Sequence, residues 1–345
     1  MSGTRERAAR GTTALRCPRC GSELRADGED TRCRGCDETY GEPLPGIPDL
    51  RLSYPDPQLS RDDDARIARE LAAHAAADDF AALLDRHWRL VGKQPELAAR
   101  FTAQEIAAGA KTEPIVDAID AARGRPIGPG DHVLEIGCGT AALGGALAAR
   151  GASVVASDLS LRWLVLAGKR LSESTAGAVE LVACAAEALP FPDESFELVA
   201  AADVVEHVES PERFVCECSR VLRPGGLLFL ATPNRYSLGL EPHVRLWGVG
   251  YLPRRAAERY VKAARGVSYD HVHLLSARTL RRMLDDAGFE TTTVAPEIPD
   301  ASQRMYRGPE LRLVRWYNRA RRTAALHAAL LAVGPFFHVF AWKRQ

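Results

Sequence analysis

The sequence predicts an α/β protein built on a doubly wound parallel sheet, and three observations point to this fold class. Short apolar segments alternate with amphipathic segments of helical periodicity from about residue 131 onward. A glycine-rich turn follows the first of these apolar segments, at the edge where parallel sheets bind ligands. The chain has 345 residues, 46% of them hydrophobic, which is enough to bury such a sheet and to carry smaller modules.

The composition divides the chain into four segments. Residues 1–16 are polar and basic without an apolar core, so we expect a flexible N-terminus, no secretory signal and a cytoplasmic protein. The other segments are a zinc ribbon at 17–52, a helical cap at 60–123, and a main domain at 124–345 with a substrate-lid insertion at 233–276.

The first segment after the N-terminus carries four cysteines in two C-x2-C pairs. These are Cys17, Cys20, Cys33 and Cys36, with twelve residues between the pairs. This spacing predicts one tetrahedral zinc ion. Because four protein ligands leave no open coordination position, we expect the zinc to be structural.

The segment 60–123 has apolar residues at helical spacing, for example Ile67 and Leu71. The acidic run Asp62–Asp64 is typical of the first turn of a helix. We expect these helices, with the insertion 233–276, to close over a substrate.

The main domain contains seven segments with the pattern of buried strands. We predict them at Val133–Ile136, Val154–Ser157, Val179–Ala183, Leu198–Ala202, Leu227–Ala231, Thr291–Val294 and Phe336–Ala341.

The turn after the first strand contains Gly137 and Gly139, and Asp158 follows about twenty residues later. This pattern is compatible with a nicotinamide dinucleotide. However, Glu135 stands two residues before the first glycine, where its charge would repel a pyrophosphate. S-adenosylmethionine has an ammonium, a sulfonium and no phosphate, and its ribose diol can bond to the carboxylate of Asp158. The site chemistry therefore favours S-adenosylmethionine.

Five ordered motifs resemble the class I S-adenosylmethionine-dependent methyltransferases, and within them the branch with quinone-biosynthesis enzymes. They are EIGCG at 135–139, the aspartate at 158, EALPFPDESFELV at 187–199, DVVEHV at 203–208 and LRPGGLL at 222–228. The resemblance covers about residues 131–232. It implies a Rossmann-like sheet of seven strands whose last strand, Phe336–Ala341, runs antiparallel.

The resemblance also implies the cofactor residues. The methionine end would meet the Glu135–Gly139 loop and Asp203, and the ribose would meet Asp158. Adenine would pack on Leu159 and the 185–187 segment, although Ala185 replaces the acid that commonly binds its amino group. The full implied set is Glu135, Gly137, Cys138, Gly139, Asp158, Leu159, Ala185, Ala186, Glu187 and Asp203.

Transfer to a hydroxyl or amine needs a general base, for which histidine is suited near neutral pH. The catalytic candidates are His271, His273 and His207, with His243 as a further candidate. We expect His207 to pack structurally. His271 and His273 would share one face of an extended segment, with Asp270 orienting whichever of them acts.

Three hypotheses about the activity follow. We favour a small organic acceptor, with oxygen slightly preferred to nitrogen or carbon. The first alternative is an RNA methyltransferase that docks through the ribbon and a basic C-terminal helix. The second is a non-catalytic cofactor-binding or activator module, because the ribbon resembles a small methyltransferase-activator protein and because of Ala185.

Charge bears on the RNA alternative. The whole chain carries 45 basic and 45 acidic side chains, and residues 1–52 hold nine arginines and nine acids. Neither the whole chain nor the ribbon therefore has the excess positive charge that binding to a phosphate backbone needs. Residues 301–345 have nine basic side chains against one acid, for a net charge of +8. We predict a helix here with Arg312, Arg315, Arg319, Arg321 and Arg322 beside Trp316 and Tyr317. A solvated helix is our preferred interpretation, over RNA contact or a peripheral membrane contact through 311–341, and no transmembrane span is expected.

Overall fold

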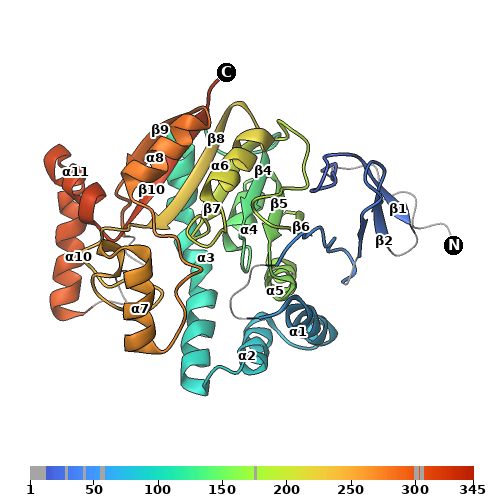
Figure 1. Ribbon diagram of the computed structural model, residues 1–345, viewed down its shortest axis with the longest axis horizontal. Helices are drawn as coiled ribbons and strands as arrows, with labels where there is room; N and C mark the ends of the chain where they lie inside the picture. Colours follow the sequence, from blue (N-terminus) through green and yellow to red (C-terminus); the bar gives the residue numbers. More distant parts are fainter. Residues whose placement is uncertain are drawn as a thin grey trace. The chain divides into compact units, whose positions relative to one another are not determined.

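The computed structural model describes residues 13–27, 30–41, 44–54, 59–174, 177–298, 303 and 307–345. It has the predicted α/β architecture (Figure 1). Seven strands form one sheet in the order β6-β5-β4-β7-β8-β10-β9. Their bounds are β4 (His132–Ile136), β5 (Ser153–Asp158), β6 (Val179–Ala183), β7 (Phe196–Ala202), β8 (Leu222–Pro233), β9 (Phe289–Val294) and β10 (Phe336–Lys343).

The strand directions confirm the predicted topology. β4, β5 and β6 pair in parallel, whereas β10 runs antiparallel to both β8 and β9. Each predicted strand lies within an observed one. The largest difference is at β8, which begins five residues earlier than we predicted, at Leu222.

The chain divides into two compact units. The first runs to Val199 and includes Arg220–Arg223, and the second comprises Ala200–Ser219 and Pro224–Gln345. The cysteine ribbon and the glycine loop belong to the first unit, and the insertion belongs to the second.

A small antiparallel sheet in the first unit precedes the helices. Its strands are β1 (Leu24–Asp27), β2 (Asp30–Cys33) and β3 (Thr39–Tyr40). This sheet is too small to bury a hydrophobic core of its own, and domains of this size usually depend on a bound metal or a neighbouring module for stability.

The segment 60–123 is helical. It forms α1 (Arg61–His74), α2 (Phe80–Leu90) and α3 (Pro95–Arg123), and the main domain adds α4 (Ala142–Ala149) and α5 (Leu161–Ser172) to this unit. Ser60 caps α1 by accepting a hydrogen bond from the backbone of Asp63, and Asp79 caps α2 in the same way. A left-handed Gly124 ends α3.

Helices α1, α2 and α5 share one hydrophobic core, and Figure 1 shows them side by side. Leu71 and Leu84 pack in it with Leu164. His87 and Trp88, which lie in the segment that we expected to cover a substrate, are buried. The ring of His87 contacts those of Trp88 and Trp163 at centroid distances of 4.6 and 4.9 Å.

The remaining helices lie in the C-terminal half. Among the described residues they are α6 (Pro211–Val221), the 3-10 helix η2 (Val249–Tyr251), α7 (Arg254–Arg265), α8 (Ala277–Asp286), α10 (Gly308–Ala320) and α11 (Ala324–Val333). None of the helices in the described part of the chain combines the length and hydrophobicity needed to cross a membrane.

The basic C-terminal helix ends earlier than predicted. α10 stops at Ala320, so Arg321 is its C-cap and Arg322 lies beyond it. The side chain of Arg321 donates to the carbonyl of Ala295 and pairs with Glu297 at 2.8 Å.

Candidate functional site

The glycine loop between β4 and α4 has the backbone conformation that the sequence predicts. Gly137 and Gly139 have φ values of 66° and 50°, in the left-handed region that favours glycine. Ala141 takes the same conformation at the N-cap of α4. The buried Cys138 donates its N–H to the carbonyl of Ser157 at the end of β5. The loop therefore brings its backbone to the carboxyl end of the next strand.

Asp158, the last residue of β5, contacts this loop directly. Its two carboxylate oxygens accept hydrogen bonds from the N–H of Gly139 at 2.9 Å and of Ser160 at 2.8 Å. Burial raises the pKa of Asp158 above its usual value, although both of these hydrogen bonds act in the other direction.

Glu135 lies at the other side of the loop and is buried. Its Oε2 accepts the N–H of Gly144, in the first turn of α4, at 2.9 Å. A Cβ atom on Gly144 would lie only 2.5 Å from this oxygen, so a glycine is needed there. Burial, helped by the charge of Asp158, raises the pKa of Glu135 to about 8. Two acids thus lie at the loop, and their ionised forms would be favoured by a cation and disfavoured by a phosphate.

The other predicted cofactor residues follow strands β5, β6 and β7. Leu159 is half-buried, Ala185 is buried, and Ala186 and Glu187 are half-buried. In the second unit, Asp203 follows β7 in a left-handed conformation with φ of 56° and donates its N–H to the carbonyl of Ala231.

Sequence reasoning missed an extended segment that holds the β5 and β6 loops. Asp49 of this segment forms a parallel bridge with Ala183, the last residue of β6. The N–H of Leu50 donates to the carbonyl of Ala183, and the N–H of Ala183 donates to that of Pro48. We call residues 44–51 the arm. Its proline-rich composition excluded a helix but gave no signal for its partner strand.

Arg51, at the end of the arm, is fully buried and anchors it. Its guanidinium forms salt bridges with Asp49 at 2.7 Å and with Asp64 of α1 at 2.9 Å. It also donates to the carbonyl of Leu159 at 2.9 Å. Asp64 additionally pairs with Arg162 at 2.8 Å. The acidic run in α1 therefore does more than stabilise the helix dipole, because its third member fixes the loop after Asp158.

In the second unit, two of the predicted histidines contact each other. The Nε2 atoms of His207 and His243 lie 3.1 Å apart. Burial, together with the charges of His243, His271 and His273, lowers the pKa of His207 to about 4. His207 thus contacts His243, a residue that the sequence did not place beside it. His243 comes from the irregular insertion, for which no periodic signal could predict a contact.

His271 and His273 differ in their surroundings. The expected extended segment is a turn at Asp270 and His271, so the two rings are not equivalent. His271 Nδ1 lies 3.5 Å from the carboxylate of Asp270. The guanidinium of Arg254 lies 3.0 Å from His273 Nδ1. Burial, and then the charge of Arg254, lowers the pKa of His273.

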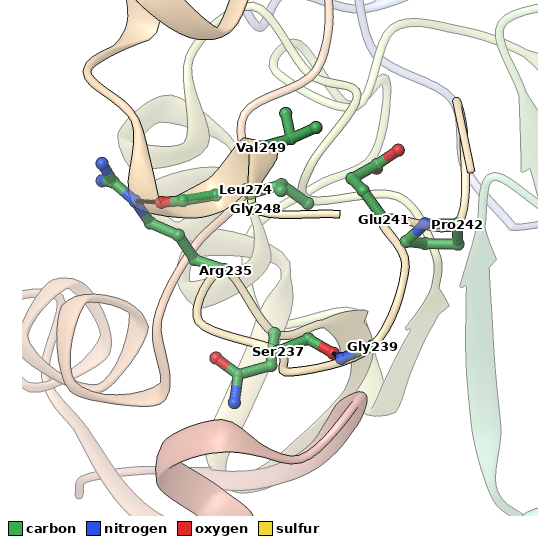
Figure 2. Close-up of a pocket in the computed structure, with 10 residues that line it drawn as sticks. Arg235, Ser237, Gly239, Glu241, Pro242, Gly248, Val249 and Leu274 are labelled. Atoms are coloured by element: carbon green, nitrogen blue, oxygen red, sulfur yellow. Dashed lines mark hydrogen bonds between the residues drawn. The ribbon is translucent and has the colours of Figure 1, made fainter. Parts of the chain in front are cut away.

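A small pocket is formed within the insertion of the second unit (Figure 2). Figure 2 shows Arg235 and Glu241 on different sides of it. Arg235 donates to the carbonyl of Gly250 at 2.9 Å. A Cβ on Gly250 would lie 1.7 Å from the carbonyl oxygen of Arg235, so the turn requires glycine. The two charged side chains of the pocket therefore already have partners within the insertion. Arg235 bonds to Gly250, and Glu241 bonds to His243 and Val244.

The four predicted zinc ligands converge in the ribbon. Their Sγ atoms lie within 4.8 Å of one another, with Cys17 to Cys36 at 3.7 Å and Cys20 to Cys33 at 3.4 Å. Zn–S bonds of about 2.3 Å in a tetrahedron separate the sulfurs by about 3.8 Å. Hydrogen bonds, chiefly from Ser22, lower the pKa of Cys20 to about 6, towards the thiolate that binds metal. The donor set fits a zinc ion.

The predicted basic surface lies partly on α10. Arg312, Arg315 and Arg319 are exposed there with Trp316, whereas Tyr317 is buried. The side chain of Tyr317 donates to the carbonyl of Pro296, so it holds the helix in place.

Comparisons with known proteins identify the central part of the chain. The profile of a family described as "Methyltransferase domain" matches residues 134–230. A ubiquinone biosynthesis O-methyltransferase of Agrobacterium fabrum is 41% identical over 111 residues, which make up 32% of this chain and 44% of that protein. A protein of the same name from Thiobacillus denitrificans is 32% identical over 179 residues, 52% of this chain and 72% of that protein.

The chain thus spans less than half the length of the Agrobacterium relative. A solved S-adenosylmethionine-dependent methyltransferase of Mesorhizobium loti superposes with a TM-score of 0.45 at 23% identity, covering 65% of this chain and 96% of that one.

Proposed function

We propose that this chain, which belongs to the class I S-adenosylmethionine-dependent methyltransferases, transfers a methyl group from S-adenosylmethionine to an oxygen atom of a small organic acceptor. The preference for oxygen is supported by the relatives named above, which are O-methyltransferases.

One observation carries the cofactor assignment, namely the two acids on the glycine loop. Asp158 bonds to Gly139 and Glu135 bonds to the start of α4. Their carboxylates suit a cationic ligand without phosphate, and a ribose diol can donate to Asp158. The other cofactor residues that we propose are Gly137, Cys138, Leu159, Ala185, Ala186, Glu187 and Asp203.

When bound, S-adenosylmethionine supplies an electrophilic methyl group on a sulfonium. The protein must then hold the acceptor in line and remove the proton of its hydroxyl. We assign the role of general base, which accepts this proton, to His271. Its Nδ1 faces Asp270, and 30% of its side chain is exposed. His273 is the weaker candidate, since Arg254 occupies its ring nitrogens.

The zinc ribbon has a structural role in this proposal. Four cysteines would hold the ion, which leaves it no open position for a substrate. The arm connects this ribbon to β6, so we infer that the bound zinc stabilises the entry to the arm.

Transfer of a labelled methyl group tests the activity. The full-length protein would be incubated with labelled S-adenosylmethionine and panels of small phenols, small alcohols, small amines and RNA. We expect label in a hydroxylated acceptor, and a loss of about 100-fold or more in His271→Asn. His327→Asn changes a histidine of α11 and is the control.

Label only in RNA would replace the small acceptor with the RNA alternative. Label in no acceptor, with intact cofactor binding, would favour the non-catalytic alternative.

A further inference from the structure

Three side chains of the second unit form a cluster that the methyl-transfer proposal does not use. Glu206 and His207 lie in the turn after β7, and His243 lies in the insertion. Their ligand atoms all lie within 4.8 Å of one another. The two Nε2 atoms are 3.1 Å apart, close to the separation of about 3.3 Å that two imidazoles have on a tetrahedral zinc ion.

Glu206 supplies independent support for a ligand. Its side chain is fully buried, and its Oε2 accepts a hydrogen bond from Thr232 at 3.1 Å. Its Oε1 is buried without a hydrogen-bond partner among the residues that the structure describes. A buried carboxylate oxygen without a partner is costly, and a cation would remove that cost.

The orientation of His243 also suits a metal ligand. Its Nδ1 donates to Oε1 of Glu241, and the other oxygen of Glu241 accepts the N–H of Val244 at 2.8 Å. This arrangement fixes the tautomer of the neutral ring, so that the lone pair is on Nε2, facing His207. A carboxylate behind a histidine is the usual support of a protein metal ligand.

We propose that Glu206, His207 and His243 bind one divalent transition-metal ion, with zinc as the best match to this donor set. Two imidazoles and one carboxylate are the three protein ligands of open zinc sites. A fourth position would then be free for an oxygen of a small molecule, unlike in the cysteine ribbon.

A role for this metal follows, and that role rests on the proposed function. An acceptor hydroxyl bound to the ion would ionise more easily. Its proton would pass to His271, the new C–O bond would form as the C–S bond breaks, and S-adenosylhomocysteine would leave as the neutral thioether. No oxidant or reductant takes part.

The test is zinc stoichiometry, which does not depend on activity. The full-length protein, with its ribbon intact, would be dialysed against buffered free zinc and its metal content measured by atomic emission. Wild type should bind about two zinc ions per chain and His243→Asn about one. His271→Asn changes a histidine of the same unit that is not a proposed ligand, and this variant should still bind about two zinc ions.

A second variant and a cobalt spectrum test the same metal site independently. Glu241→Gln keeps all three ligands, and it should weaken the second zinc about 10- to 100-fold. Cobalt added to protein with a zinc-filled ribbon should give visible bands without thiolate charge transfer. One zinc per wild-type chain would overturn the site and leave an ordinary hydrogen bond between His207 and His243. Two zincs without methyl transfer would instead contradict only the proposed function.

Discussion

Glu135 and Asp158 are acids whose environments disfavour their charged forms in the free protein. Burial raises the pKa of both, and that of Glu135 to about 8. Each accepts a backbone N–H at the glycine loop, which holds it in place. A cationic ligand would favour their charged forms, so binding and ionisation should be linked.

This linkage predicts that cofactor affinity depends on pH. At pH 5.5 most free molecules carry a proton on Glu135, and binding must remove it. As pH rises to 7.5, the fraction already ionised grows, so affinity should increase by up to about tenfold per pH unit. Calorimetric titration with S-adenosylmethionine at several pH values measures this affinity. Glu135→Gln should bind weakly and without this slope, and a flat wild-type profile would contradict the assignment of Glu135.

Gly144 is predicted to be essential for the same acid. In Gly144→Ala the new Cβ would lie 2.5 Å from Glu135 Oε2, so the carboxylate must move away from α4. We expect a loss of about 1–3 kcal/mol of unfolding free energy and weaker cofactor binding.

The matched control is Gly168→Ala on α5. Its nearest neighbour, Leu181 Cδ1, would be 3.5 Å from the new Cβ, which is ordinary contact. This change should be neutral or stabilising by up to about 1 kcal/mol. Equal effects of the two substitutions in urea unfolding would show that Glu135 is not held by Gly144.

Among the elements, the arm has the clearest energetic role. It carries Asp49 and Arg51 into a buried network with Asp64 of α1. Replacing Arg51 by Met would remove the buried cation that the two carboxylates share, leaving Asp64 with Arg162 and Asp49 with only the half-exposed Arg61. We expect a loss of about 3–5 kcal/mol in the free energy of unfolding. Urea titration measures it.

Arg61→Met is the control for the arm. Arg61 also pairs with Asp49, at 3.2 Å, but its side chain is 46% exposed. Exposed ion pairs contribute about 1 kcal/mol or less. A similar, small effect of both substitutions would mean that the arm is not anchored through Arg51.

The ribbon should depend on its metal. Cys17→Ser removes a buried ligand of the proposed zinc site, so it should lose that zinc and unfold the ribbon. Cys216→Ser changes an exposed cysteine outside the cluster and should keep the metal. The readouts are metal content and limited proteolysis of the N-terminal region. Retention of the ribbon zinc by Cys17→Ser would contradict the four-cysteine site.

At the scale of the whole molecule, the strands could be predicted because their signals are local. Each strand is a short apolar segment next to a turn, and the EIGCG motif marks the first βα turn. The same locality explains the prediction of the cysteine site, since two C-x2-C pairs need only one hairpin to meet.

Contacts between distant segments could not be predicted. His243 reaches His207 across 36 positions of sequence, from an insertion without periodicity. Arg51 reaches Leu159 from an arm that follows no periodic pattern. Arg321, at the C-cap of α10, pairs with Glu297, 24 positions before it. Such pairings are set by packing after the local elements exist.

The most direct test of the account is calorimetric titration of the full-length protein with S-adenosylmethionine, repeated on Asp158→Ala and on the exposed-site control Asp62→Ala. The account predicts that wild type and Asp62→Ala bind with equal affinity. Asp158→Ala should bind at least tenfold more weakly, a loss of about 1.4 kcal/mol or more. Absence of wild-type binding, or binding that is unchanged in Asp158→Ala, would contradict the assignment of the glycine loop as the cofactor site.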